Sequence, residues 1–362
     1  MYIESLKLTS FRNFSSFILK PDKGINILYG SNGSGKTNIL ESIFLLCLGR
    51  SQRGAHDSAM STNGEDVYRV EGTIGLDDSL HTCSVACQRG SSKKITIDGA
   101  TAKTSELFNR HSVVSIGPED YLIISGAPSM RRTFLDTYIS QFSREYLSRL
   151  IDYQRTLAQK NAALKSEQDP SPFNSLLVPL GADITLSRSH FVQFLSEKSA
   201  HYYKSISDGG LLELGYHSSV CPGTQPDEID SILSSFESRL YDFSEREKIM
   251  KTAMIGPHRD DLQVKISGYQ ARTHASRGEI RTASIALKLA VYHLLRQERK
   301  RTPVLLLDEI FSELDKNRSE ALIESFSDFG QLFLTSAVDP IETMQGRGTA
   351  LRLHSGELKR KR

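Results

Sequence analysis

Eight residues, Gly30-Ser-Asn-Gly-Ser-Gly-Lys-Thr37, match the pattern of a loop that wraps a phosphate group. Such a loop points successive backbone N–H groups inward, and its glycines allow the backbone angles and the close approach that this requires. The lysine would neutralise the β- and γ-phosphates of a nucleotide, and the threonine hydroxyl would ligate Mg²⁺. The alternative is a chance match in a flexible loop. The residues expected to bind the nucleotide are Gly30, Ser31, Asn32, Gly33, Ser34, Gly35, Lys36 and Thr37.

Two adjacent acids, Asp308 and Glu309, end an apolar run at residues 304–307. Acids at the end of a buried strand are costly unless a cation or a reaction needs them. Asp308 is suited to holding Mg²⁺, directly or through water, and Glu309 is suited to polarising an attacking water as a general base. The plainer alternative is a strand that ends in exposed acids. Together with the phosphate loop, the acids predict a nucleotide-hydrolysing site with Glu309 and Lys36 as its catalytic residues.

A third motif, Ala275-Ser-Arg-Gly-Glu279, comes just before a helical pattern and about thirty residues before the acidic pair. By itself it is a weak signal, because Ser276 followed three residues later by Glu279 is also a helix capping box. Its place between the phosphate loop and the acidic strand raises its weight as a functional motif. A fourth motif, Ser312-Glu-Leu-Asp315, follows the acidic strand and is expected to form a turn that also touches a partner.

Hydrophobic patterns predict the elements that must position these motifs. A buried strand at 25–29 leads into the phosphate loop, and apolar residues at helical spacing follow it. Residues 4–10 alternate like an edge strand and residues 62–101 like antiparallel strands, whereas helical patterns cover 130–165, 182–203, 229–243 and 284–296. Further strands are expected at 262–266, 304–307 and 332–335. The predicted fold is an α/β ATPase lobe from residues 1–116 and 252–362, with mixed sheets, and an inserted, mainly helical lobe from 117–251.

Length and composition bound the class of protein. The 362 residues exceed what one compact core usually organises, which agrees with two lobes. With 45 Lys and Arg against 43 Asp and Glu, the net charge of +2 excludes a protein that is basic throughout but allows a local basic patch. Four cysteines without C-x-x-C spacing indicate neither zinc nor a disulfide scaffold. Without a membrane-length apolar run or a signal-peptide pattern, we expect a cytoplasmic protein with no membrane partner.

A basic stretch offers a candidate contact with DNA phosphates. Residues 131–165 hold seven basic residues against three acidic ones, a net charge of +4. Arg144 and Arg155 are eleven positions apart, which places them on one helix face that could follow a phosphate backbone. A solvated face is an equal alternative. Contact with nucleic acid or packing within the fold is likewise open for Phe11-Arg12-Asn13 and for His258-Arg259.

The order of these motifs resembles the ABC-type ATPase head, the group that includes the SMC and double-strand-break repair ATPases. More specifically, the chain resembles the bacterial RecF recombination-mediator family along essentially its whole length. The segments that carry this closer resemblance lie outside the nucleotide motifs, at residues 6–14, 117–120, 128–136 and 256–261. The lack of a long coiled-coil pattern and of a zinc-hook C-x-x-C agrees with it.

The resemblance implies a homodimer that forms with ATP and Mg²⁺, in which each ATP lies between the phosphate loop of one subunit and the signature of the other. Ser276, Gly278 and Asp315 would then contact the nucleotide, while Thr37 and Asp308 hold Mg²⁺. The resemblance also implies binding to single-stranded, gapped and double-stranded DNA. With RecO and RecR, such a protein helps to load recombinase at gaps and supports replication restart and SOS induction.

The chain departs from the general ABC pattern at several positions. Arg277 replaces a small residue of the signature, Glu279 stands where Gln is commoner, and Thr335-Ser336 stands where a histidine often follows the last core strand. No simple Gln-loop is evident, and residues 117–120 lie about where one would be. These departures predict slow turnover, and with the resemblance they imply a weak, DNA-stimulated ATPase. They leave open a non-hydrolysing, nucleotide-gated scaffold that recruits repair partners. A head of an anti-phage or nuclease system should carry a Toprim-like acidic cluster, which the sequence after residue 296 lacks.

Overall fold

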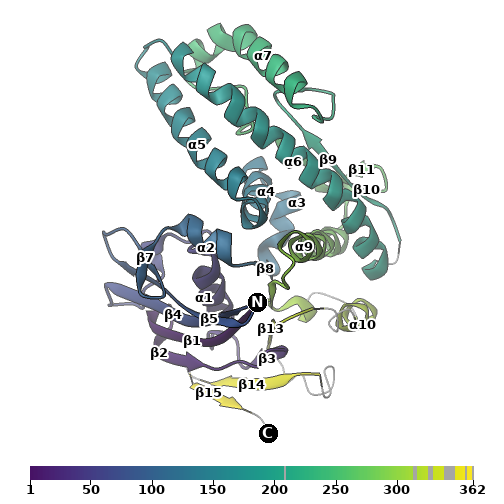
Figure 1. Ribbon diagram of the computed structural model, residues 1–362. Coiled ribbons are helices and arrows are strands. Elements are labelled where there is room, and N and C mark those ends of the chain that lie inside the picture. Colours follow the sequence, from purple (N-terminus) through teal and green to yellow (C-terminus); the bar gives the residue numbers. More distant parts are fainter. Residues whose placement is uncertain (208, 313–315, 325–328, 338–346, 355–356, 361–362) are drawn as a thin grey trace. The chain divides into compact units, whose positions relative to one another are not determined.

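The computed structural model describes residues 1–207, 209–312, 316–324, 329–337, 347–354 and 357–360. They divide into two compact units: residues 1–120 and 291–362 form the first, and residues 121–290 form the second (Figure 1). The ATPase lobe predicted from residues 1–116 and 252–362 includes residues 252–290. In the structure these residues cluster with the second unit, because the strand β10 (Asp261–Ile266) pairs along its length with β9 (Leu212–His217). The assignment of residues 252–290 to an ATPase lobe stays a prediction.

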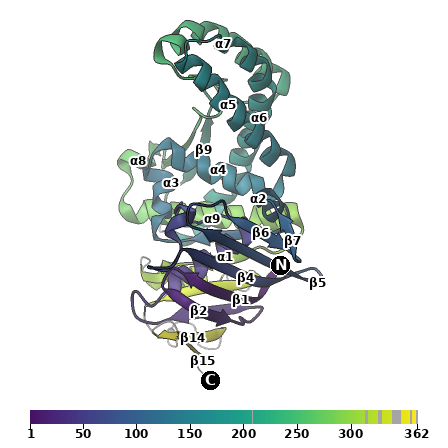
Figure 2. The same ribbon diagram turned by 90° about the vertical axis from the view of Figure 1, so that its left-hand side faces the viewer.

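An antiparallel sheet of the first unit has six strands in the order β2-β1-β4-β5-β6-β7 (Figure 2). Asp98 and Gly99, both with positive φ, form the tight turn between β6 and β7, as the Asp-Gly signal predicts. The expectation that β1 is an edge strand is wrong, because β1 pairs with β2 on one side and β4 on the other. The strands are β1 (Tyr2–Phe11), β2 (Phe14–Leu19), β4 (Val67–Leu76), β5 (Ser79–Gln88), β6 (Lys94–Ile97) and β7 (Ala100–Ala102).

The other sheet of the first unit has the order β15-β14-β3-β13-β12-β8, and all its pairs are parallel except β14 with β15. Its central strands are mostly apolar and nearly all their residues are buried, which is typical of parallel strands covered on both faces. The strands predicted at 25–29, 304–307 and 332–335 are present, whereas β8, β14 and β15 were not predicted. The strands are β3 (Ile25–Tyr29), β8 (Val113–Ile116), β12 (Val304–Leu307), β13 (Leu332–Ser336), β14 (Thr349–His354) and β15 (Glu357–Arg360).

Register within this sheet decides which residues can meet. Leu334 of β13 pairs with Leu307 of β12 and with Ile27 of β3. Because the strands are parallel, the residues that follow these three positions emerge at one edge of the sheet. The phosphate loop and the acidic pair therefore belong to a single site. The helices of this unit are α1 (Lys36–Leu48), α2 (Thr104–Arg110) and α10 (Lys316–Glu324), with 3₁₀ turns at Asp57–Ala59, Pro118–Tyr121 and Ile310–Ser312.

The second unit is mainly helical and carries one small antiparallel sheet in the order β11-β10-β9. The predicted helix over 130–165 is two helices that meet at Ser143, whose side chain caps the second. The helix predicted from 284 begins seven residues earlier, at Arg277. The remaining elements are α3 (Leu122–Ser125), α4 (Pro128–Phe142), α5 (Arg144–Lys165), α6 (Ser171–Ile206), α7 (Ile229–Met250), β11 (Tyr269–Gln270), α8 (Ala271–His274) and α9 (Arg277–Arg299), which carries the chain back into the first unit.

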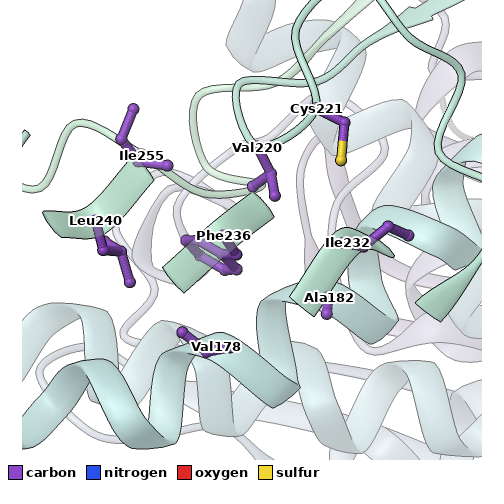
Figure 3. Packing of buried hydrophobic residues seen from close by; sticks show 8 residues of the cluster. All are labelled: Val178, Ala182, Val220, Cys221, Ile232, Phe236, Leu240 and Ile255. Atoms are coloured by element: carbon purple, nitrogen blue, oxygen red, sulfur yellow. The ribbon is translucent and has the colours of Figure 1, made fainter. Parts of the chain in front are cut away.

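Helix α6 is longer than the sequence predicts, because two prolines do not end it. Pro172 lies in its first turn, where no backbone N–H is needed, and Pro179 lies inside it. On either side of Pro179, Val178 and Ala182 pack against α7 through Phe236 (Figure 3). The rest of this cluster is Val220, Cys221, Ile232, Leu240 and Ile255. Burial against a second helix thus maintains α6 across a residue that disfavours it. The α/β class with an inserted helical lobe is confirmed.

No helix in the described part of the chain is long and apolar enough to cross a membrane.

Candidate nucleotide-binding site

The phosphate-loop motif lies between β3 and α1, as predicted. Gly30 leaves β3 with φ of 154° and Gly35 precedes α1 with φ of 104°, both in the region that favours glycine. A Cβ on Gly30 would lie 2.2 Å from the carbonyl oxygen of Leu353, and one on Gly35 would lie 2.5 Å from a ring carbon of Phe14. Both positions therefore require glycine on conformational and steric grounds. No side chain caps α1, so the N–H groups of its first turn suit an anion.

The remaining residues of the loop comprise three exposed residues at its tip and one buried residue, Ser34. Ser31, Asn32 and Gly33 are exposed, whereas Ser34 is buried and donates its backbone N–H to the carbonyl oxygen of Ser31 across 3.2 Å. The Ser34 hydroxyl is enclosed and has no hydrogen-bond partner among the described residues. The loop is thus closed on itself by backbone hydrogen bonding and keeps polar groups for a ligand.

Lys36 lies inside the loop that precedes it. Its ammonium group donates to the carbonyl oxygens of Gly30 at 2.8 Å and Ser31 at 3.1 Å, and it lies 3.8 Å from Glu309 Oε1. Only 4% of the residue is exposed. A buried ammonium group whose partners are two neutral carbonyl oxygens and one carboxylate attracts a further anion, because its positive charge is poorly screened.

Thr37 and Asp308 meet although they are 271 positions apart. The Thr37 hydroxyl donates to Asp308 Oδ1 across 2.9 Å, and the hydroxyl of Thr335 donates to the same oxygen across 2.7 Å. The Asp308 N–H donates to the carbonyl oxygen of Ile116 at the end of β8, which fixes its backbone. The structure therefore brings together the predicted metal ligands and adds Thr335, which sequence reasoning treated only as the place of a missing histidine.

Glu309 has a left-handed backbone conformation, with φ of 49°. This region is uncommon for a residue with a side chain and costs free energy unless neighbouring contacts hold it. Its backbone N–H donates to the Thr335 hydroxyl across 2.8 Å, and one third of its side chain is exposed. The turn after β12 thus places the Glu309 carboxylate beside Lys36 and within reach of solvent.

The oxygen atoms around Asp308 fit a magnesium ion. Thr37 and Asp308 supply a hydroxyl and a carboxylate, the oxygen ligands that Mg²⁺ prefers. Within the described ranges, no group of three or more His, Cys, Asp or Glu side chains could hold a metal. An ion held by Thr37 and Asp308 would therefore take its other ligands from phosphate oxygens and water, which is common where Mg²⁺ accompanies a nucleotide.

Arg12 and Asn13 support the loop from the turn between β1 and β2. Arg12 forms two hydrogen bonds with Glu41 of α1, and Asn13 donates to the carbonyl oxygen of Ser34 across 3.3 Å. The side-chain oxygen Oδ1 of Asn13 accepts from the side-chain amide of Asn38 across 2.8 Å. Of the two alternatives left open for this segment, these contacts show packing within the fold.

The signature motif lies in the second unit, at the start of α9. Ser276 and Glu279 form a reciprocal capping box: the Ser276 N–H donates to Glu279 Oε2 at 2.8 Å, and the Glu279 N–H donates to the Ser276 hydroxyl at 3.3 Å. The plainer interpretation of this motif is therefore present in the structure. Ser276, Arg277 and Gly278 are exposed, so the same turn can still meet a partner. Asp315 lies outside the described residues.

Ion pairing engages part of the basic stretch at 131–165, and contact of Arg144 and Arg155 with DNA phosphates stays a prediction. Four of its seven basic side chains pair with acids of the same unit. The pairs are Arg131–Asp261, Arg149–Asp183, Arg155–Asp152 and Lys160–Glu247. Paired charges leave little net field for a phosphate backbone, so these contacts favour the structural alternative.

His258 is half-buried and Arg259 is exposed, and both contact the backbone of their own unit. The His258 ring accepts from the Tyr153 hydroxyl at Nδ1 across 2.7 Å, and its Nε2 lies 3.2 Å from the carbonyl oxygen of Ala253. Arg259 donates to that same carbonyl oxygen. Burial lowers the pKa of His258 from 6.5 to about 4, so the ring is neutral at pH 7. These residues pack and pair within the second unit.

Comparison with known proteins covers nearly the whole chain. Residues 2–347 match a family model described as the RecF/RecN/SMC N terminal domain. A relative from Lachnoclostridium phytofermentans, described as DNA replication and repair protein RecF, is 36% identical over 334 aligned residues and covers 90% of each chain. A relative of the same description from Halalkalibacterium halodurans is 32% identical over 373 aligned positions and covers all of both chains.

Solved structures give the same result at the level of the fold. A structure described as the recombination mediator protein RecF with ATP in the RecFOR pathway has a TM-score of 0.92 at 30% identity, over 100% of this chain and 98% of that chain. A structure of an Smc head bound to the C-winged helix domain of ScpA has a TM-score of 0.58 at 16% identity, over 100% of this chain and 97% of the other. The second likeness shows a shared fold alone.

Proposed function

This chain belongs to the RecF family within the wider RecF/RecN/SMC group, and on that premise we propose that it is an ATP-dependent DNA-binding protein of recombinational gap repair. Its relatives are described as DNA replication and repair proteins, and one solved relative contains ATP. The observation that carries the proposal is the hydrogen bond between the Thr37 and Asp308 side chains, which joins the phosphate loop to the acidic strand.

ATP binding would use the loop as it stands. The N–H groups at the start of α1 and the Lys36 ammonium would receive the β- and γ-phosphates, and Lys36 would exchange its contacts with the Gly30 and Ser31 carbonyls for charged ones. Thr37 and Asp308 would hold Mg²⁺, which when bound neutralises the developing charge on the phosphates. This part of the site needs no rearrangement of the sheet.

Hydrolysis would depend on Glu309. Its partly exposed carboxylate is suited to orienting a water molecule and accepting its proton as a general base. In the structure the same carboxylate lies 3.8 Å from the Lys36 ammonium group. A γ-phosphate that draws Lys36 to itself would therefore release Glu309 for the water. The Arg277 and Glu279 departures in the signature favour slow turnover.

Dimerisation would complete the site. The exposed turn at Ser276 and Gly278, together with Asp315, would contact ATP bound by the other subunit, so that ATP stabilises the dimer and ADP releases it. The dimer would bind single-stranded, gapped and double-stranded DNA and act with RecO and RecR in loading recombinase, replication restart and SOS induction. The support for these partners is family membership and the RecFOR pathway in the description of the solved relative.

The test is sedimentation velocity with no nucleotide, with ADP, and with ATP and Mg²⁺, each with and without gapped duplex DNA. We expect ATP to drive dimerisation and gapped DNA to bind the dimer. Ser276→Arg should abolish the dimer while ATP binding persists, and Ser205→Arg, at an exposed serine of the same unit, is the matched control. Lys36→Met should weaken ATP binding about tenfold or more, the size of a lost charged hydrogen bond. An oligomeric state that ignores nucleotide would overturn the clamp mechanism.

Turnover separates the enzyme from the alternative scaffold. Wild-type chain and Glu309→Gln should bind ATP equally, and only the wild type should release phosphate. Equal phosphate release by the two proteins, at the background rate, would favour the nucleotide-gated scaffold. That result would leave ATP binding and dimerisation in place.

A further inference from the structure

Thr335 contacts both acids of the site through one hydroxyl group. We propose that Thr335 is a positioning residue that sets the geometry of Asp308 and Glu309 and thereby the response of the site to Mg²⁺. The proposal rests on the nucleotide-binding function proposed above and adds a residue to it. Sequence reasoning placed no role at this position.

The contacts of Thr335 use both hydrogen-bonding capacities of its hydroxyl. Its O–H donates to Asp308 Oδ1 at 2.7 Å, and its oxygen accepts the backbone N–H of Glu309 at 2.8 Å. Only 1% of Thr335 is exposed. Both hydrogen bonds are therefore shielded from water, where the loss of one partner leaves the other polar group unsatisfied.

The sheet explains why a residue of β13 has this role. Strand β13 lies between β3, which leads into the phosphate loop, and β12, which ends at the acids. Leu334 pairs with Leu307 across one side and with Ile27 across the other. The next residue, Thr335, consequently stands level with Asp308 at the edge of the sheet where the loop begins.

The hydroxyl groups of Thr37 and Thr335, which both donate to Asp308 Oδ1, have different roles. Thr37 donates to Asp308 Oδ1 but is itself a predicted Mg²⁺ ligand, so its position depends on the metal and the nucleotide. Thr335 belongs to a buried strand and holds the same oxygen independently of either. This fixes the direction of the carboxylate plane before the ion arrives, and preorganisation of a ligand lowers the cost of binding.

Thr335 also constrains the backbone of Glu309. Its φ of 49° is a strained conformation that persists only where the surroundings hold it. The Thr335 oxygen holds the N–H of that residue, so it constrains the backbone from which the Glu309 carboxylate projects. One hydroxyl therefore acts on the metal ligand through its side chain and on the general base through its backbone.

The experiment measures the affinity of a fluorescent ATP analogue as a function of Mg²⁺ concentration for wild-type chain, Thr335→Val and Thr335→Ser. Mg²⁺ should increase the nucleotide affinity of the valine variant about tenfold less, or weaker still, than it increases that of the wild type, because a hydrogen bond to a charged group is lost. The Mg²⁺ concentration at half-saturation should rise by a similar factor. Its affinity in excess chelator should stay within about twofold of wild type, and the serine variant should recover the Mg²⁺ response. Turnover at saturating ATP and Mg²⁺ should also fall in the valine variant, because the Glu309 backbone loses its hydrogen bond to Thr335.

Thr137→Val is the matched control, since it removes a buried hydroxyl from α4 in the second unit. It should leave the Mg²⁺ response unchanged. If Thr335→Val does not fold, Thr335→Ala takes its place, because a smaller side chain avoids burying a second methyl group beside the carboxylate. A Mg²⁺ response equal to wild type in the folded variant overturns the inference and leaves the proposed function standing. Failure of the wild-type chain to bind ATP removes the proposed function itself.

Discussion

Arg12 and Glu41 form a bidentate ion pair, with Nε 2.9 Å from Oε2 and Nη2 2.7 Å from Oε1. The Glu41 side chain is fully enclosed and lies on α1, the helix that begins with Lys36. Glu41 Oε1 also accepts from the Ser51 hydroxyl. The turn between β1 and β2 is thereby joined to the helix that carries the phosphate loop.

Removal of Arg12 should therefore destabilise the fold strongly. Arg12→Ala would leave the Glu41 carboxylate buried with only the Ser51 hydroxyl, and we expect a loss of about 3–5 kcal/mol of unfolding free energy. Arg12→Lys, which keeps the charge but not the fork, should lose less. Urea unfolding measures both, and Lys20→Ala, at an exposed position directly after β2, is the control. A loss no larger than that of the control would contradict this account.

Lys160 and Glu247 provide a second buried ion pair, 2.6 Å apart between α5 and α7, with 0% and 3% of the side chains exposed. Lys160→Met should cost about 3–5 kcal/mol, because it leaves the Glu247 charge uncompensated. The double variant Lys160→Met with Glu247→Gln should be more stable than Lys160→Met alone, since the amide oxygen still accepts the Met254 N–H. A double-mutant cycle by thermal or urea unfolding checks this. Additive losses would show that the two charges do not interact.

At Gly181, the cost of crowding the packed side chains and the helix propensity of alanine act in opposite directions. Alanine in the middle of α6 should by itself favour the helix by about 1 kcal/mol. A Cβ there would, however, lie 2.4 Å from a ring carbon of Phe236 and 3.1 Å from one of Tyr153, and overpacking costs about 1–3 kcal/mol. We expect Gly181→Ala to lower the unfolding free energy, whereas Gln193→Ala, at an exposed position of α6, should change it by less than about 0.5 kcal/mol. A stabilised Gly181→Ala would mean that the rings move aside without cost.

The lowered pKa of His258 predicts that the free energy of unfolding depends on pH in the acid range. Its pKa is about 4 in the folded chain and 6.5 when unperturbed, so between these values the unfolded chain binds the additional proton. Stability is therefore complete above about pH 6.5 and declines as the pH falls toward 4, by up to about 3 kcal/mol. His258→Gln should flatten this slope in unfolding free energies measured from pH 7 to pH 4.5.

His111 provides an independent comparison in the first unit. It is also buried, with its pKa lowered to about 4, so His111→Gln should flatten the slope by a similar amount. The two effects should add, because the residues belong to different units. If neither variant alters the slope, buried neutral histidines are not the source of acid sensitivity.

The sequence by itself determined the nucleotide site at the level of motifs. The motif from Gly30 to Thr37 can be recognised from its own residues, because the positions of its glycines and its lysine are local features of the sequence. The same holds for the apolar run that ends in Asp308 and Glu309. The same local logic predicted β3, β12 and β13 and the Asp98-Gly99 turn.

Only the tertiary structure decided which residues support that site and which charges are neutralised. Thr335 became part of it because parallel register sets β13 level with β12, and register is a non-local property that periodicity does not contain. Pairing of Lys160 with Glu247 and of Arg12 with Glu41 likewise joins residues far apart in the chain. The course of α6 through Pro179 was also a tertiary outcome, because burial against α7 outweighs the local preference of a proline to end a helix.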